Sequence, residues 1–352
     1  VSDPRWILAL FLILAAMFSA LLTKDTVAVI ATPIAIILAS RFGVSNNLFL
    51  MGLCFCISIG SMLTPIGNPQ NVLVAVSSDM PTPFLTFFKF LAVPTLINLV
   101  ICYYWLRWCY RKDFMNNKLV NRDLSEQQKD LFNLDLAAEI PSYDSKSKSS
   151  SNCSADVNFE RNNLLVKNNA IWPVYLSLLL FIAMIFYDAA AQLIKTTSPL
   201  PIGALSVIAC LPIYCFSNHR LSVFRKIDWH TLLLFVSLFV VMEAVREAPF
   251  FQYWISHSRL DLQDPPVVVS LSLLGSQVIS NVPLVQLYLP FIQHGHISAY
   301  ICLAMASTVA SNIFIISAAS NMIVVQMAEK KGVNSVTFWR FAKVGIPLAF
   351  LN

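Results

Sequence analysis

Charged residues are scarce in this chain. Only 12% of its 352 residues are Asp, Glu, Lys or Arg, whereas 57% are hydrophobic and the mean hydropathy is +0.66. A soluble domain carries about 25% charged residues, so this composition excludes a water-soluble globule of this size. The net charge of +5 is dispersed around apolar segments instead of forming a basic face, which argues against nucleic acid as a partner. The sequence therefore predicts an integral membrane protein.

Motifs for metal binding and enzymatic catalysis are also missing. The 8 cysteines lack the spacing of a zinc site or a disulfide framework. The sequence has no His-Glu-x-x-His, Gly-x-Ser-x-Gly or phosphate-loop pattern, so nothing in it supports a membrane-embedded enzyme. The first apolar run continues into further membrane sequence and does not end at a signal-peptide cleavage site. We therefore expect neither a bound metal nor a cofactor.

The apolar runs of the first half differ in length. Residues 7–22 and 27–40 are shorter than the roughly 20 residues of a spanning helix and are separated by four polar residues. The longer stretch 48–76 is interrupted at residues 64–71, where two prolines and a glycine favour unwinding. A run that can span the membrane follows at residues 90–106. This order predicts a helical hairpin, a broken helix and a spanning helix.

The same order recurs in the second half. The segment 86–90 (TFFKF) returns as 337–341 (TFWRF), and 71–74 (NVLV) returns as 321–324 (NMIV). Such internal similarity indicates a structural repeat. The predicted fold is an all-α polytopic membrane protein with two repeats, each containing a re-entrant helical hairpin and a broken transmembrane helix. Its predicted parts are a first repeat at 1–106, a disordered loop at 107–169, connecting helices at 170–230 and a second repeat at 231–352.

Basic residues orient the two repeats. Arg107, Arg111 and Lys112 follow the first spanning run, whereas the preceding loop 77–83 has no Lys or Arg. The positive-inside rule then places loop 107–169 in the cytoplasm and inverts the second repeat relative to the first. We expect the protein in the cell (inner) membrane. Because the chain begins at Val1 and stops soon after its last apolar run begins, we also expect further sequence at both ends, with the second repeat truncated.

Polar residues at the tips and breaks are the candidate binding residues. A charged side chain at the membrane centre costs about 2.5–3.5 kcal/mol, so a function is the default interpretation. Helix N-termini attract anions and unwound carbonyls hold cations at such breaks. The alternatives are a solvated extracellular turn at the first tip and a purely structural kink at the prolines. The candidates are Thr23, Lys24, Asp25, Thr26, Thr64, Gly67, Asn68, Asn71, Ser280, Asn281, Ser317, Ser320 and Asn321.

Three of these segments resemble one membrane-protein family. Residues 64–71 (TPIGNPQN), 280–283 (SNVP) and 317–321 are similar to signatures of the ion transporter superfamily, which includes arsenite pumps, NhaD-type sodium/proton antiporters and citrate or dicarboxylate permeases. The resemblance covers residues 7–106 and 231–352. It implies two inverted repeats, a dimer and an elevator-like movement of the substrate. The family usually has Asn where this chain has Lys24, and a glycine is common in place of Ser317.

These features predict a secondary active transporter for a small inorganic or carboxylate anion, with Na+ or H+ as the coupling ion. Its partners would be the anionic or ionic substrate, the lipid bilayer and a second copy of the chain. We expect the Lys24 ammonium either to replace a bound sodium ion beside Asp25 or to attract the anion. One alternative is a sodium/proton antiporter in which Asp25 titrates, and another is a non-transporting receptor or scaffold that signals through loop 107–169.

Overall fold

The structure is a computed structural model in which the regular elements of the described residues are all helices. The chain divides into two compact units, one formed by Val1–Asp130 with Phe235–Asn352 and the other by Leu131–Leu234. The candidate residues all belong to the first unit. The residues that the structure describes are 4–78, 80, 82–115, 172–184, 186–187, 190, 202–216, 229–249, 253, 257, 260–292, 296–333 and 336–352.

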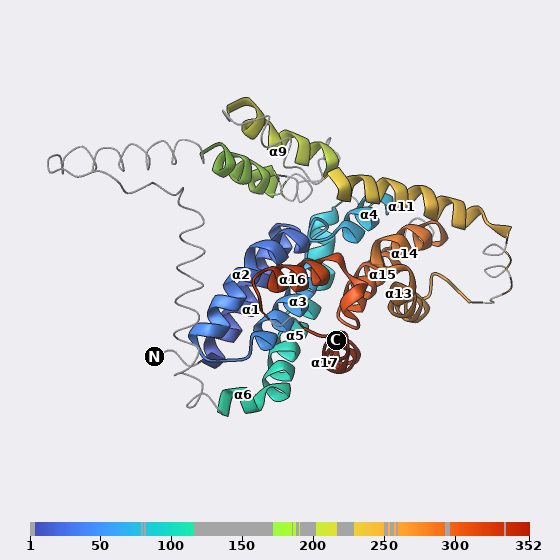
Figure 1. Ribbon diagram of the computed structural model, residues 1–352. Helices are drawn as coiled ribbons and strands as arrows, with labels where there is room; N and C mark the ends of the chain where they lie inside the picture. The colour runs from blue at the N-terminus through green and yellow to red at the C-terminus, as the bar shows by residue number, and fades with distance from the viewer. Residues whose placement is uncertain are drawn as a thin grey trace. The chain divides into compact units, whose positions relative to one another are not determined.

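The N-terminal part of the first unit follows the predicted order of elements (Figure 1). A hairpin of two contacting helices precedes a helix that is interrupted and resumes, and a long helix follows. The interruption lies between Ser61 and Pro69, at the predicted prolines and glycine. The helices are α1 (Pro4–Leu21), α2 (Lys24–Arg41), α3 (Asn46–Ser61), α4 (Pro69–Ser77), α5 (Pro83–Cys109) and α6 (Arg111–Met115).

The C-terminal part repeats this order after α11 (Trp229–Glu247). Its hairpin has a shorter second helix, which ends where Pro290 opens a 3-10 turn. Its broken helix stops at Ala310 and resumes at Ala319, although this segment contains neither proline nor glycine. The elements are α13 (Pro265–Ile279), α14 (Asn281–Tyr288), η1 (Leu289–Phe291), α15 (Ile297–Ala310), η2 (Ile315–Ser317), α16 (Ala319–Lys330) and α17 (Phe338–Leu351).

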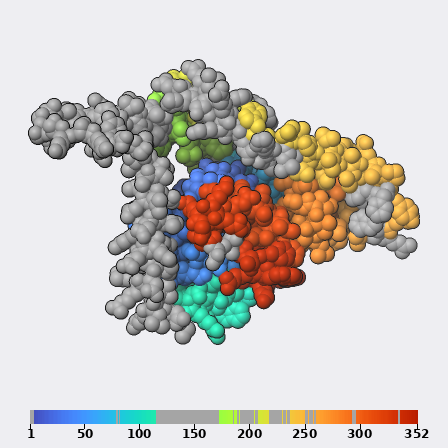
Figure 2. Space-filling model, viewed as in Figure 1, coloured from blue at the N-terminus to red at the C-terminus, as the bar shows by residue number. Residues whose placement is uncertain are grey.

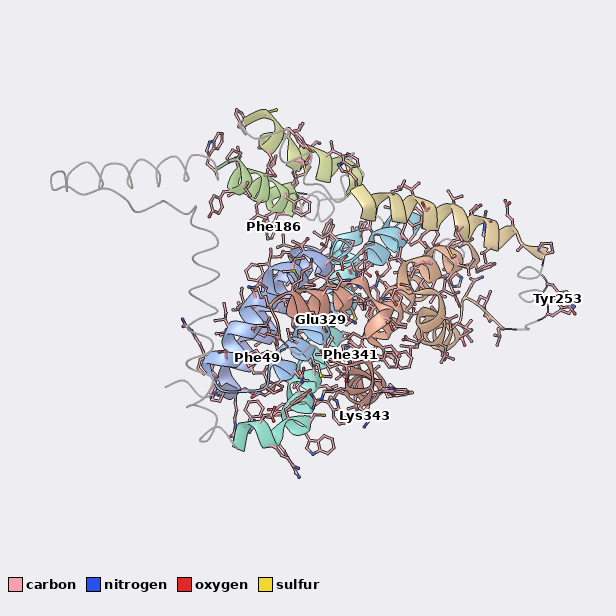
Figure 3. The ribbon with its side chains drawn as sticks, in the orientation of Figure 1. Phe49, Phe186, Tyr253, Glu329, Phe341 and Lys343 are labelled. Carbon is pink, nitrogen blue, oxygen red and sulfur yellow. The ribbon has the colours of Figure 1, made fainter. Side chains whose placement is uncertain are left out.

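Helix α3 forms the centre of this unit. All residues from Leu48 to Ser61 are buried, as expected for a helix that is apolar on every side. It packs against α1, α2 and α5. The approach to α1 is close, because a Cβ atom at Gly60 would lie 2.2 Å from the Ala16 carbonyl oxygen. Phe49 on α3 and Phe341 on α17, both labelled in Figure 3, are fully buried.

The two halves of the unit pack reciprocally. Helix α16 lies on α2 of the first hairpin, and α14 of the second hairpin lies on α4. Figures 1 and 2 show the C-terminal segment that contains α16 against the N-terminal helices. The last helices of the two halves, α5 and α17, are also in contact. Trp105 Nε1 on α5 donates a hydrogen bond of 2.9 Å to the Val344 carbonyl on α17. Each half therefore contributes to the surroundings of the other half's break.

Within the described part of the chain, two helices, α1 and α5, are long and apolar enough to cross a membrane. Both expose large apolar side chains along one face, which suits contact with lipid acyl chains. Helix α5 extends beyond the predicted run 90–106 at both ends, and at its N-terminal end Pro83 fits the first turn of a helix. Helix α6 then occupies part of the predicted loop 107–169. Residues 116–169 of that loop lie outside the described residues.

The second unit contains the helix Trp172–Met184 and α9 (Ile202–Phe216), which correspond to the predicted connecting helices. The two helices contact each other, since the Ser177 hydroxyl donates to the Ala209 carbonyl. The rings of Trp172 and Phe216 also lie 5.2 Å apart.

Candidate functional site

The first hairpin tip is bonded to the break that follows α3. The Lys24 backbone N–H, in the first turn of α2, donates to the Gly67 carbonyl at 2.9 Å. The Thr64 hydroxyl donates to the Ala20 carbonyl at the end of α1, at 2.5 Å. We call this arrangement of tip residues 22–26 and break residues 61–71 the first junction. It brings together the candidates that the sequence placed in the first repeat.

Both helices that begin at the first junction have side-chain caps. The Thr23 hydroxyl accepts from the Thr26 N–H at 3.3 Å and lies 2.8 Å from the Thr26 hydroxyl. Asn68 Oδ1 accepts from the Asn71 N–H at 2.8 Å and so caps α4. Thr and Asn are preferred at this position because their oxygens satisfy N–H groups of the first turn. Four candidate residues thus have a clear local role in starting α2 and α4.

Asn71 holds the shape of the first break. Its Nδ2 donates to the carbonyls of Ser61, at 3.0 Å, and Thr64, at 2.9 Å. These carbonyls lie where the helical ladder ends, so they need donors from elsewhere. Gly67 turns tightly against the same segment, because a Cβ there would lie 2.3 Å from the Ser61 carbonyl oxygen. The break therefore depends on an amide donor and on the absence of a side chain at position 67.

Lys24 at the first junction is buried, and Asp25 is half-buried. Lys24 is 4% exposed, and Asp25 Oδ1 is buried without a hydrogen-bond donor. Lys24 forms no ion pair within the described residues. The ion pair found there joins Arg246 to Glu243, far along the sequence. Two further acceptors at the start of α4, Gln70 Oε1 and Asn71 Oδ1, are also buried without a partner. Lys24 is thus buried, whereas Thr23 and Thr26 of the same tip are exposed.

The second hairpin tip is bonded to the second break in a similar way. Asn281 Nδ2, at the start of α14, donates to the Ser311 hydroxyl at 2.6 Å. The Ser317 hydroxyl donates to Gln277 Oε1 near the end of α13, at 2.5 Å. Asn321 Nδ2 donates to the Ser311 carbonyl at 2.8 Å. We call residues 277–281 with break residues 311–321 the second junction.

One hydrogen bond is the same in both junctions. Asn71 Nδ2 bonds the carbonyl of Ser61, ten residues earlier, and Asn321 Nδ2 bonds the carbonyl of Ser311, also ten residues earlier. In both cases the amide lies in the first turn of the resumed helix and the carbonyl lies at the end of the interrupted helix. The two breaks are therefore built on the same local plan.

The junctions differ in how their polar groups are satisfied. No side chain within the described part of the chain caps α14 or α16, whose N-cap residues are Ser280 and Ala318. Five buried polar atoms here have no partner, and they include both donors and acceptors: Asn281 Oδ1, Asn312 Nδ2, Asn312 Oδ1, Ser320 Oγ and Asn321 Oδ1. Buried polar groups are normally hydrogen-bonded, so this cluster requires an explanation such as a ligand.

A polar contact connects the two junctions. Asn68 Nδ2 donates to the Ser61 hydroxyl at 3.0 Å and lies 3.2 Å from the Thr308 hydroxyl oxygen on α15. Gln70 Nε2 approaches the same oxygen at 3.5 Å. Thr308 is one turn before Ser311 of the second break. The candidate residues of both repeats thus belong to one connected polar region.

Ser280 adopts a strained backbone conformation. Its φ of 75° and ψ of 160° make it the one non-glycine residue with positive φ among the residues described. This region is essentially limited to glycine and costs about 1–3 kcal/mol for other residues. The strain arises because a single residue separates α13 from α14 and must reverse the chain.

We predict that Ser280→Gly stabilises the protein. Strain of about 1–3 kcal/mol is relieved, and the greater freedom of glycine in the unfolded chain costs about 0.5–1 kcal/mol, so the net gain should be about 1 kcal/mol. The midpoint of thermal unfolding measures this change. Ser270→Gly, at an exposed position inside α13, is the matched control and should destabilise by about 0.5–1 kcal/mol. Equal losses of stability in both variants would contradict the assignment of strain.

Comparison with known proteins identifies the family. The model of the citrate transporter family matches residues 2–310. The chain belongs to the citrate transporter family. The predicted resemblance to the ion transporter superfamily is therefore confirmed, and this member of the citrate transporter family is an integral membrane transporter.

Its relatives are distant but cover nearly the whole chain. An uncharacterized transporter of Mycobacterium tuberculosis is 22% identical, over 98% of this chain and 74% of its own length. The P protein of Homo sapiens is 22% identical, over 99% of this chain and 48% of its own length. The putative transporter arsB of Dictyostelium discoideum is 22% identical, over 96% of this chain and 72% of its own length.

The sequence analysis missed several polar residues of this citrate transporter family member. Thr308 and Gln70 join the junctions, and Gln277 bonds both Ser317 and the Ala310 carbonyl, the latter at 3.0 Å. Ser311 and Asn312 form the second break. Alignment of residues 61–71 with 311–321 could have found Ser311, which matches Ser61. Gln70 lies within the motif 64–71, whereas Thr308 and Gln277 have no local signal, because they bond residues far away in the sequence.

Proposed function

We propose that this transporter is a secondary active carrier of a small inorganic or carboxylate anion, coupled to an ion gradient. The observation that carries the proposal is the set of unpartnered polar atoms at the second junction. Asn312 Nδ2 and the Ser320 hydroxyl can donate to an anion, while Asn281 Oδ1 and Asn321 Oδ1 can accept from or coordinate a cation. A site with both kinds of group can bind an anion and a cation together.

The helix ends support binding of an anion. Helices α14 and α16 begin at the second junction without side-chain caps, so their first N–H groups are open to another acceptor. The N-terminus of a helix carries a partial positive charge, which favours an anion. The buried polar side chains beside these ends, Asn312 and Ser320, add donors of a second kind. Together they provide an anion site that does not require a basic side chain.

We also propose that the two repeats are inverted, with re-entrant hairpins, as alternating access requires. The reciprocal contacts of α2 with α16 and of α14 with α4 support this arrangement. The packing of α5 on α17 supports it too. Trp105 bonds Val344, and Arg340, at the start of α17, opposes the rise that burial causes in the pKa of Asp113 in α6. From the first pair to the second, the position rises from 105 to 113 in α5 and α6 and falls from 344 to 340 in α17. The two segments therefore run antiparallel. We place the protein in the cell inner membrane with loop 107–169 in the cytoplasm.

Flux in proteoliposomes tests the proposal. Purified protein would be reconstituted, and uptake and efflux of citrate, succinate, sulfate and arsenite measured with sodium and pH gradients imposed separately. We expect a flux of at least one anion that one gradient drives and that collapses when the gradient is dissipated. Asn312→Ala should reduce this flux, because the amide is removed from the second junction. Folded protein that carries none of these anions under any gradient would reject the proposal.

One observation favours a second candidate, a sodium/proton antiporter. Asp25 Oδ1 is buried without a donor, and a carboxyl in such a position can exchange a proton for a cation. Sodium added to sealed proteoliposomes would then change the internal pH, and Asp25→Asn would abolish the change. Under the anion proposal, sodium alone causes no change of internal pH.

A further inference from the structure

We propose that the end of α5, the short helix α6 and the start of α17 form a binding surface for the headgroup of an anionic phospholipid. None of its residues belongs to either junction, and lipid binding here does not depend on what the transporter carries. We call this surface the basic rim, and its five basic residues are Arg107, Arg111, Lys112, Arg340 and Lys343.

The basic rim joins the two halves of the larger unit. Helices α5 and α17 are in contact, and Trp105 Nε1 bonds the Val344 carbonyl at 2.9 Å. Tyr110, the C-cap of α5, and Asp113 in α6 both lie near Arg340. Burial raises the pKa of these two groups, and the positive charge of Arg340 opposes the rise in both. Basic residues from the two halves therefore meet at one end of the helices.

Tyr110 fixes the level of the basic rim along α3. Its hydroxyl donates to Met51 Sδ at 2.9 Å, near the start of that helix. The first junction lies at the other end, where α3 stops at Ser61. A helix rises about 1.5 Å per residue, so Met51 and Ser61 are about 15 Å apart along the axis. An anion at the rim is therefore separate from the first junction.

The positive charge of the basic rim exceeds the negative charge beside it. Arg107 is half-buried, and the other four basic side chains are exposed, among them Lys343 on α17 (Figure 3). None of the five forms an ion pair with a carboxylate of the described residues. Asp113 supplies one half-buried carboxyl against these five cations. This excess of positive charge favours an anionic partner.

Exposed apolar side chains continue from the basic rim and indicate a lipid as that partner. On α5, Tyr104 and Trp108 are exposed, and exposed aliphatic side chains precede them. On α17, Trp339 is exposed beside Arg340, and Phe350 lies further along the same exposed face. Tyr and Trp are enriched at the level of lipid headgroups, and clustered Lys and Arg attract anionic ones. A phospholipid can contact both features, whereas a soluble anion would leave the apolar faces unused.

Lipid titration tests the basic rim. The full chain would be purified in a neutral detergent, and its affinity for phosphatidylglycerol and for phosphatidylcholine with the same acyl chains measured by native mass spectrometry. We expect tighter binding of phosphatidylglycerol. Arg111→Gln and Arg340→Gln should each weaken it roughly fivefold, because each removes one charge beside the headgroup, and should leave phosphatidylcholine binding unchanged. Arg340→Lys keeps the charge and should retain the preference. Lys89→Gln, exposed near the other end of α5, is the matched control and should change neither affinity.

Each outcome supports or rejects a lipid site at the basic rim. Equal affinities for the two lipids reject it. A preference for phosphatidylglycerol that survives in Arg111→Gln and Arg340→Gln also rejects it, because the anionic lipid then binds elsewhere. A loss confined to one of these arginines rejects a surface shared by α6 and α17. If phosphatidylglycerol binds only after residues 116–169 are deleted, that segment of the chain is the occupant and the lipid is not. Anion flux enters none of these measurements, so their results are independent of the proposed function.

Discussion

Gly67→Ala is expected to abolish transport and to lower the stability of the protein by about 3 kcal/mol, at the upper end of the usual cost of overpacking. The new Cβ would lie 2.3 Å from the Ser61 carbonyl oxygen and 2.8 Å from the Ser61 Cα. Both atoms are backbone, so no side chain can rotate away to relieve the contact. The substitution would also displace the Gly67 carbonyl, which accepts from the Lys24 N–H at 2.9 Å.

Anion flux per folded protein and the midpoint of thermal unfolding together measure this effect. Gly52→Ala on α3 is the matched control, because its Cβ would meet the end of the Leu12 side chain at 3.0 Å, and that side chain can move. We expect the control to keep its flux and to lose less than about 1 kcal/mol of stability. If Gly67→Ala transports as well as Gly52→Ala, the close contact at the first junction has no functional importance.

The first junction was predictable because its signals are local. Lys24 and Asp25 interrupt an apolar run, which predicts a hairpin tip, and the prolines around Gly67 predict the break. The structure has both features at these positions. The repeat of residues 71–74 at 321–324 then predicted where the second break should be found. Thus charge, proline and internal similarity were sufficient to order the helices of the larger unit.

The second junction depends on contacts that a local pattern cannot show. No proline or glycine ends α15, and the break is held by Asn281 and Asn321, which bond the side chain and the carbonyl of Ser311. These partners are 30 and 10 residues away in the sequence. The positive φ of Ser280 was also unpredictable, because serine has no preference for this conformation. Tertiary hydrogen bonds therefore override local propensity at this break.

Asn71→Ala and Asn321→Ala form the second pair of variants with large expected effects. Asn71 donates to two carbonyls, those of Ser61 and Thr64, whereas Asn321 donates to the Ser311 carbonyl. A carbonyl left unsatisfied in a buried position costs about 1–3 kcal/mol. The half-buried Thr64 carbonyl keeps the Gly67 N–H at 3.4 Å, so Asn71→Ala should lose more stability than Asn321→Ala but less than twice as much. Both variants also lose an unpartnered Oδ1, so both should transport poorly even at temperatures where they remain folded.

The comparison separates the structural role of these amides from their role in binding. Gln326→Ala, an amide truncation at an exposed position of α16, is the control and should change neither stability nor flux. Flux is measured at a temperature well below the unfolding midpoints of Asn321→Ala and Gln326→Ala, where both variants are folded. A loss of flux in Asn321→Ala then reflects the missing Oδ1 acceptor and not unfolding. If its flux equals that of Gln326→Ala, the Asn321 oxygen does not contact an ion. The second junction would then be a structural break, and the ion site would have to be sought around Asn312 and Ser320.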